Sequence, residues 1–201
     1  LVAFKAHFEG GRLPGQIELH GFEGGYCGIS HVEGGRVNVC WIARTEALRS
    51  AGGRPEAMIA ETLSGNPALA ARLDGMERVS DSFLAIGQVS LARKQLFAGD
   101  VCMIGDTAGM IAPLCGDGMA MALQSAALAA PLAVGFLEGR ATPEGFRTRY
   151  AAAWRRAFGR RMRIGRWIHE GYVRPRVASL GVRLLRRVPA LGRWLIRQTR
   201  G

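Results

Sequence analysis

The chain has 201 residues, of which 48% are hydrophobic and 21% are charged. This length and composition are typical of a globular protein that buries a sizeable core, and they exclude a low-complexity chain. The net charge of +11 is concentrated at one end, because 17 arginines lie between Arg140 and Arg200 against two carboxylates, Glu144 and Glu170.

Cysteine and histidine residues are too scattered for a disulfide framework or a metal centre. The four cysteines stand at positions 27, 40, 102 and 115, and the four histidines at 7, 20, 31 and 169. Three cysteines lie in strand-like apolar runs, where a free thiol acts as a small hydrophobe. We therefore predict reduced cysteines, a cytoplasmic location and no metal site.

The first segment, residues 1–98, begins with strand patterns. LVAFKAHFEG alternates apolar and polar residues, and QIELHGF, GGYCGISHV and RVNVCWIA follow between glycine pairs. The stretch VEGGRV predicts a hairpin, because Gly34 and Gly35 can supply the positive φ of a tight turn. Trp41 is expected in the core.

Helices are expected next, over residues 44–51, 54–64 and 67–74, with a further strand near 76–86. This order predicts an antiparallel sheet with helices beside it rather than a βαβ series. The chain opens in a strand pattern, without a basic region followed by an apolar leader. We therefore expect no secretory signal and a sequence that begins in the middle of a fold.

The second segment, residues 99–139, contains VCMIGDTAGMIAPLCGDGMAMAL. A buried strand over 101–104 is expected to end at Gly105 and Asp106, whose carboxylate can accept hydrogen bonds from hydroxyl groups. Gly116 and Gly118 lack Cβ atoms, so the backbone there can approach a flat ring. The helix that begins near Gly118 has unpaired N–H groups at its start, which favour an anion.

A simpler interpretation is that Asp117 caps an ordinary buried helix. That interpretation explains one residue and leaves the Gly-Asp pair, Pro113 and the two later glycines without a reason. We therefore favour a site for a polar ligand with a flat ring.

The stretch IGDTAGMIAPLCGDGMAMAL resembles the second FAD fingerprint of the para-hydroxybenzoate hydroxylase-type flavoproteins, which include geranylgeranyl reductases and flavin-dependent halogenases. The matching positions are Gly105, Asp106, Ala108, Pro113, Gly116 and Gly118. The resemblance implies that Asp106 binds the ribityl chain of FAD. It also implies that the backbone from Gly116 through Asp117 and Gly118 to Met119 faces the pyrimidine side of the isoalloxazine.

The stretch GYCGISHVEGGRVNVCWI resembles substrate-domain strands of bacterial geranylgeranyl-reductase-like oxidoreductases. The resemblance implies an α+β fold: an antiparallel substrate-domain sheet, then the C-terminal strand, loop and helix of a Rossmann-like FAD/NAD(P)-binding domain, then a helical tail. The family's first fingerprint, G-x-G-x-x-G, is absent from this sequence. We therefore expect the N-terminal dinucleotide-binding half to be missing, and this fragment alone to be inactive.

Tyr26, His31 and Cys115 are weak candidates for catalysis, and for each a structural role competes with the chemical one. The run from Met119 to Leu137 has no charged residue and approaches the length of a membrane span. Its alanines, Gln124 and Ser125 favour instead a buried helix, which Pro131 should kink or interrupt.

The third segment, residues 140–201, is expected to be helical, with a start at Thr142 and Pro143 and breaks at Pro175 and Pro189. Its last part, 176–200, combines an apolar stripe with many arginines. Three interpretations compete: a helix packed on the protein body, a surface that binds anionic membrane lipids, and a nucleic-acid surface. Nucleic acid is the least favoured of the three.

The resemblance implies an FAD-dependent oxidoreductase with NAD(P)H as the expected electron donor. The substrate would be hydrophobic, and the reaction would be either reduction of isoprenoid C=C bonds or hydroxylation of a lipid-like or aromatic compound. The alternative is a non-catalytic basic module that binds a membrane surface or nucleic acid. If the protein is the oxidoreductase, we expect it in the cytoplasm, with the basic tail on the inner face of the membrane.

Overall fold

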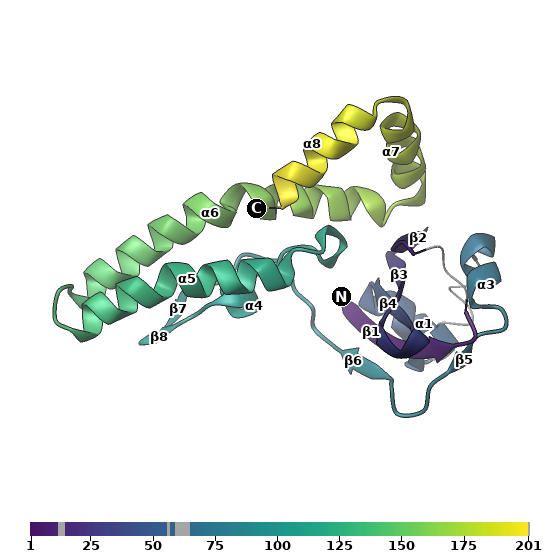
Figure 1. Cartoon of the computed structure of the whole chain (residues 1–201), viewed down its shortest axis with the longest axis horizontal. Helices are drawn as coiled ribbons and strands as arrows, with labels where there is room; N and C mark the ends of the chain where they lie inside the picture. Colours follow the sequence, from purple (N-terminus) through teal and green to yellow (C-terminus); the bar gives the residue numbers. More distant parts are fainter. Residues whose placement is uncertain (12–14, 56, 59–64, 201) are drawn as a thin grey trace. The chain divides into compact units, whose positions relative to one another are not determined.

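The computed structural model describes residues 1–11, 15–55, 57–58 and 65–200. The chain folds as two compact units, one formed by residues 1–89 and 170–182, and the other by residues 90–169 and those from 183 onward. Figure 1 labels the helices and strands of both units.

The first unit is built on an antiparallel sheet with the strand order β2-β3-β4-β1-β5, and β6 also pairs with β1. The strands are β1 (Val2–Glu9), β2 (Glu18–Phe22), β3 (Gly25–His31), β4 (Val37–Ala43), β5 (Glu77–Arg78) and β6 (Leu84–Ile86). Every pairing among them is antiparallel, which confirms the expected sheet type.

The hairpin between β3 and β4 forms where the glycine pair predicts it. Gly34 and Gly35 have φ values of 73° and 72°, in the left-handed region that favours glycine. The Val32 N–H donates to the Arg36 carbonyl at 2.9 Å, which closes the turn.

Alternation along the central strands places one face of the sheet in the core. Phe4 of β1 lies opposite Trp41 of β4, and their rings stack with centroids 5.3 Å apart. Both side chains are buried, so Trp41 is a core residue as predicted. Helices α1 (Thr45–Ser50) and α3 (Pro67–Leu73) confirm two of the expected helices, and the third, over 54–64, lies mostly outside the described residues.

The prediction of one continuous strand near 76–86 is wrong. Two short strands, β5 and β6, pair with β1 instead, and a turn separates them. Asp81 adopts a positive φ of 56° in this turn, and the Ser82 hydroxyl donates to the Val79 carbonyl at 2.7 Å. This local turn interrupts the strand.

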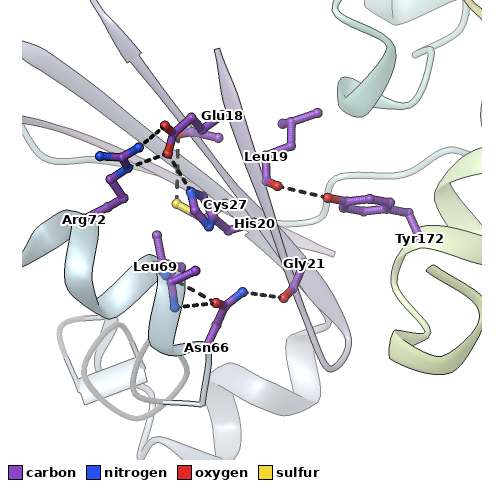
Figure 2. A network of polar contacts seen from close by, with 11 residues as sticks. Glu18, Leu19, His20, Gly21, Cys27, Asn66, Leu69, Arg72 and Tyr172 are labelled. Carbon is purple, nitrogen blue, oxygen red and sulfur yellow. Dashed lines mark hydrogen bonds and ion pairs between the residues drawn. The ribbon is translucent and has the colours of Figure 1, made fainter. Parts of the chain in front are cut away.

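Polar contacts fasten α3 to the edge strand β2 (Figure 2). Arg72 donates two hydrogen bonds to the Glu18 carboxylate, at 2.8 and 2.6 Å, and the His20 ring lies 3.1 Å from the same group. The Asn66 side chain accepts from the Ala68 and Leu69 N–H groups and donates to the Gly21 carbonyl at 3.0 Å. Asn66 therefore caps the helix and joins it to the strand.

Glu18 gives the first unit a pH-dependent stability. The bond from Arg72 holds the pKa of the Glu18 carboxyl below its ordinary value of 4.5, with a smaller contribution from His20, while burial opposes the shift. The folded state thus binds the proton less well than the unfolded chain, so this stabilisation is present above pH 4.5 and disappears as the pH falls through the lowered pKa. We expect Glu18→Gln to lower the free energy of unfolding by about 1 kcal/mol at neutral pH.

Urea unfolding of the two proteins across the acidic range measures this effect, and the difference should vanish at low pH. The matched control is Glu9→Gln, because the Glu9–Arg36 pair is exposed and contributes little. Equal losses in the two variants, or a Glu18 loss that does not depend on pH, would contradict the assignment.

The second unit contains a small sheet of β7 (Phe97–Ala98) and β8 (Val101–Cys102) and the short helix α4 (Gly105–Ala108). Helices α5 (Gly118–Leu137) and α6 (Pro143–Tyr172) lie side by side (Figure 1), joined by core contacts of Ala129 with Phe146 and Tyr150. The Gly145 N–H donates to the Thr142 hydroxyl at 3.1 Å, so α6 begins as predicted.

Prolines mark the later helix boundaries as expected. Helix α7 (Pro175–Arg187) begins at Pro175, and α8 (Pro189–Thr199) begins at Pro189. At Pro131 the interruption is absent, because α5 continues through this residue. Pro131 itself is exposed.

The expectation that α5 is buried is correct for one face only. By length and composition this helix could cross a membrane, and only 17% of its apolar window is buried. Its exposed apolar residues, called the α5 stripe, are Met119, Leu123, Val134 and Leu137, with exposed fractions of 85%, 74%, 47% and 80%.

Candidate functional site

The segment that carries the expected cofactor loop begins at an exposed strand. We expected a buried strand over 101–104, but β8 is two residues long, and Val101 and Ile104 are 62% and 44% exposed. Among the described residues β8 pairs only with β7, so its other edge and one face are open.

Helix α4 holds Asp106, whose side chain is exposed. Gly105 has a φ of 56°, and its N–H donates to the buried Ser125 hydroxyl at 2.8 Å, which ties α4 to α5. Lys94 Nζ donates to the Asp106 backbone carbonyl at 2.7 Å. The exposed Asp106 carboxylate has no bonding partner among the described residues, so it is free to accept hydrogen bonds from a ligand.

The loop before α5 has the open backbone that a flat ring requires. Gly116 adopts a left-handed conformation with a φ of 65°, and the nearest atom to a Cβ added there is Arg200 Nη2, at 3.9 Å. A Cβ added at Gly118 would meet nothing within 4 Å. Pro113 opens the preceding turn, Pro113–Cys115.

The start of α5 leaves N–H groups unpaired. The first intrahelical bond runs from the Met121 N–H to the Asp117 carbonyl at 3.0 Å, and the Asp117 side chain makes no capping bond. The N–H groups of the first turn are thus available to an anion, next to the partial positive charge of the helix end.

The Asp117 carboxylate faces α6 instead. It is 6% exposed and lies 3.4 Å from Arg161 Nη1, and Arg161 also donates to Gln124 at 2.9 Å. This ion pair fixes the start of α5 against α6. Asp117 can therefore serve a ligand through its backbone, while its side chain holds the loop in place.

Cys115 is packed under the loop. Its Sγ lies 3.1 Å from the place of a Cβ at Gly165 of α6, so a larger residue at 165 would push the Cys115 side chain away by a small amount. Burial, and secondarily the Asp117 charge, raise the pKa of the Cys115 thiol to about 11, while Arg200 opposes the shift. The thiol is neutral at physiological pH, which favours the space-filling role over the chemical one.

The other two catalytic candidates lie in the first unit, on β3. Tyr26 is buried, with its ring 5.9 Å from that of Tyr172 in an edge-on arrangement, and His31 is exposed at the end of the strand. Both residues thus belong to the sheet of the first unit, and a catalytic role for either stays a prediction.

Sequence reasoning missed Lys94, Ser125 and Arg161, which position the loop through contacts between residues 12, 20 and 44 positions apart. A polar Ser125 within an uncharged helix was the one local signal. Within the described ranges no cluster of three His, Cys, Asp or Glu residues could hold a metal ion.

No protein-family model matches the chain, and no curated protein sequence matches it significantly. Solved structures do match. The chain is similar to the flavin-dependent brominase Bmp2, with a TM-score of 0.75 and 18% identity over 98% of this chain and 49% of that one. It is also similar to PqsL, a probable FAD-dependent monooxygenase from Pseudomonas aeruginosa, with a TM-score of 0.59 and 18% identity over 89% of this chain and 50% of that one.

A third match is a geranylgeranyl bacteriochlorophyll reductase-like protein from Thermoplasma acidophilum, with a TM-score of 0.66 and 17% identity over 86% of this chain and 43% of that one. The chain thus has a fold found in FAD-dependent halogenases, monooxygenases and reductases, as the sequence resemblance implied. It spans half or less of the length of each of these proteins.

Proposed function

We propose that this chain is the C-terminal part of an FAD-dependent oxidoreductase that acts on a hydrophobic small molecule. The observation that carries the proposal is the open backbone at Gly116 and Gly118, before and at the start of α5, in the same unit as the exposed carboxylate of Asp106. The fold shared with FAD-dependent enzymes supports it.

The residues of the second unit suit FAD in three ways. Asp106 would accept hydrogen bonds from ribityl hydroxyls, and the open backbone at Gly116 and Gly118 would lie against the ring. The unpaired N–H groups of α5 would face the pyrimidine edge, where a reduced flavin carries negative charge. When bound, FAD would supply the transfer of hydride or the activation of oxygen, with a reduced nicotinamide dinucleotide as electron donor.

The α5 stripe supports the proposal that a dinucleotide-binding half completes the site. Four large apolar side chains are exposed on one helix face, and Val101 and Ile104 of the same unit are exposed as well. Soluble proteins usually cover exposed apolar surface of this kind. We propose that a segment N-terminal to Leu1, carrying a G-x-G-x-x-G motif on a strand–helix unit, packs on this surface.

Oxygen consumption by the full-length protein distinguishes the two chemistries. Stoichiometric uptake of oxygen with substrate would assign hydroxylation, and substrate reduction without uptake would assign a reductase of isoprenoid C=C bonds. A protein that binds no FAD at any stage would exclude the enzyme and favour the non-catalytic basic module.

We further propose that the tail binds the anionic surface of a membrane from the cytoplasmic side. On α7, Val177, Leu180 and Leu184 share one face and are 48%, 68% and 48% exposed. By helical spacing, Arg183 and Arg186 lie away from this face, and Arg176 and Arg187 flank it. An apolar face bordered by arginines is typical of a helix that lies at a lipid interface.

Vesicle binding tests this surface. We expect the full-length protein to sediment with anionic vesicles and not with neutral ones, and less so at high salt. Leu180→Ser with Leu184→Ser should weaken binding about tenfold, because the apolar side chains no longer enter the lipid. The matched variant Arg183→Gln with Arg187→Gln should weaken it as well.

If the tail bound nucleic acid instead, the arginine variant would lose affinity for nucleic acid and the leucine variant would keep it. Equal partitioning of the wild-type protein to anionic and neutral vesicles, or to neither, would contradict the membrane proposal.

A further inference from the structure

A basic groove runs along one face of α6 within the second unit. It encloses about 680 Å³ and is lined by the segment 93–97, by the end of α4 and by residues of α6 from Glu144 to Trp167. Its volume falls in the range of clefts that hold small-molecule ligands, roughly 300–1,000 Å³. The groove shares Lys94 and the end of α4 with the flavin loop described above, but its arginines and Trp167 are not part of that loop.

The groove is cationic because its arginines lack acidic partners. Of the six cations that line it, Arg147 pairs with Asp100 at 2.9 Å. Within the described part of the chain, no ion pair joins a carboxylate to the other five, which are Arg93, Lys94, Arg155, Arg163 and Arg166. Such a cluster repels itself in the folded protein, and a bound anion would relieve that repulsion.

The uncompensated charge is confined to one part of the groove. From Arg155 to Arg166 the helix advances about 17 Å. Glu144 lies toward the other end, where a carboxylate would repel a polyanion that continued along the helix. The charge therefore suits one compact anion better than a long nucleic-acid strand.

An exposed aromatic side chain accompanies these cations. Trp167 lines the groove and is 71% exposed, which is unusual for so large an apolar group. Arg166 donates to the Leu91 carbonyl, so the segment that carries Arg93 lies beside this end of α6. Guanidinium groups bind phosphate oxygens, and an indole face stacks on a base.

We infer that the groove binds the phosphates and a ring of a nucleotide, and that in the proposed enzyme this nucleotide is the reduced nicotinamide dinucleotide that supplies electrons. This inference rests on the proposed function for the identity of the nucleotide. The charge of the groove and the exposed indole of Trp167 by themselves support a nucleotide as the class of ligand.

Titration of this 201-residue chain with NADPH tests the inference without flavin, with the fluorescence anisotropy of the nucleotide as the readout. Arg93→Gln with Arg163→Gln should weaken binding at least about tenfold, because two charged hydrogen bonds to phosphate are lost. Among the described residues neither arginine bonds to another element of the fold, so the variant should stay folded. Trp167→Gln should also weaken binding, by about tenfold, through lost stacking.

The matched control is Arg156→Gln with Arg160→Gln, which removes the same charge from exposed positions of α6 outside the groove. It should leave NADPH affinity unchanged, and inorganic pyrophosphate should compete with NADPH. Absence of NADPH binding, or equal weakening in both double variants, would overturn the inference. Tighter binding of a short single-stranded oligonucleotide that is lost in the same groove variant would assign a nucleic-acid surface instead. FAD retention is measured separately. A lack of NADPH binding would therefore leave the flavin proposal standing, and a lack of FAD binding would leave the nucleotide groove standing.

Discussion

Replacement of Gly116 by Val is expected to lower the affinity of the full-length protein for FAD by at least about a hundredfold, a loss of about 2.7 kcal/mol. Gly116 has a φ of 65°, which a β-branched residue adopts only at a cost. The added side chain would also enter the space in which the isoalloxazine is proposed to lie. FAD retained after dialysis, measured from its absorbance, gives the result.

The control for this variant is Gly139→Val. Gly139 follows α5 at its opposite end, has a φ of 74° and has nothing within 4 Å of an added Cβ, so valine there imposes a similar backbone strain far from the loop. We expect Gly139→Val to lose stability and keep FAD. If both variants retained FAD equally well, the ring would not lie against Gly116.

Local patterns predicted those parts of the fold whose causes are local. Alternation identified the strands of the first unit, the Gly34–Gly35 pair identified their hairpin, and Thr142, Pro175 and Pro189 marked helix boundaries. Each of these features depends on the backbone preferences of a few consecutive residues.

The contacts that position the candidate site depend on distant residues. The sequence indicated a loop after Gly105, and the structure has a short helix there, anchored by Ser125 and Lys94. Arg161 looked like one more charge in a basic tail, but it pairs with the buried Asp117. Composition could not separate it from the exposed arginines beside it, because only the packing of α5 on α6 brings the two charges together.

Packing also explains why positions 109 and 165 are glycine, which the requirements of a turn do not explain. A Cβ at Gly109 would lie 2.9 Å from the Trp154 ring, and one at Gly165 would lie 3.1 Å from Cys115. Both glycines let the cofactor loop lie directly on α6. The sequence shows that glycines are frequent, but their purpose at these positions follows only from the helix that they touch.

Replacement of Asp106 by Ala is expected to weaken FAD binding about 10- to 100-fold, because a ribityl hydroxyl loses a charged acceptor worth about 1.5–3 kcal/mol. The fold should tolerate this change. The contacts of α4 run through the Gly105 N–H and the Asp106 carbonyl, and both persist when the side chain is removed. Loss of FAD can therefore be read as loss of a ligand contact. Asp106→Asn keeps an acceptor without the charge and should fall between the two.

Asp100→Ala is the matched control, since it removes another exposed carboxylate from the same unit with the same change in net charge. FAD affinity should be unchanged in that variant, measured by titration of the apoprotein with FAD. If Asp106→Ala bound FAD as tightly as Asp100→Ala did, the free carboxylate on α4 would not be a flavin ligand. The Gly116 result would then decide by itself whether the loop before α5 faces the ring.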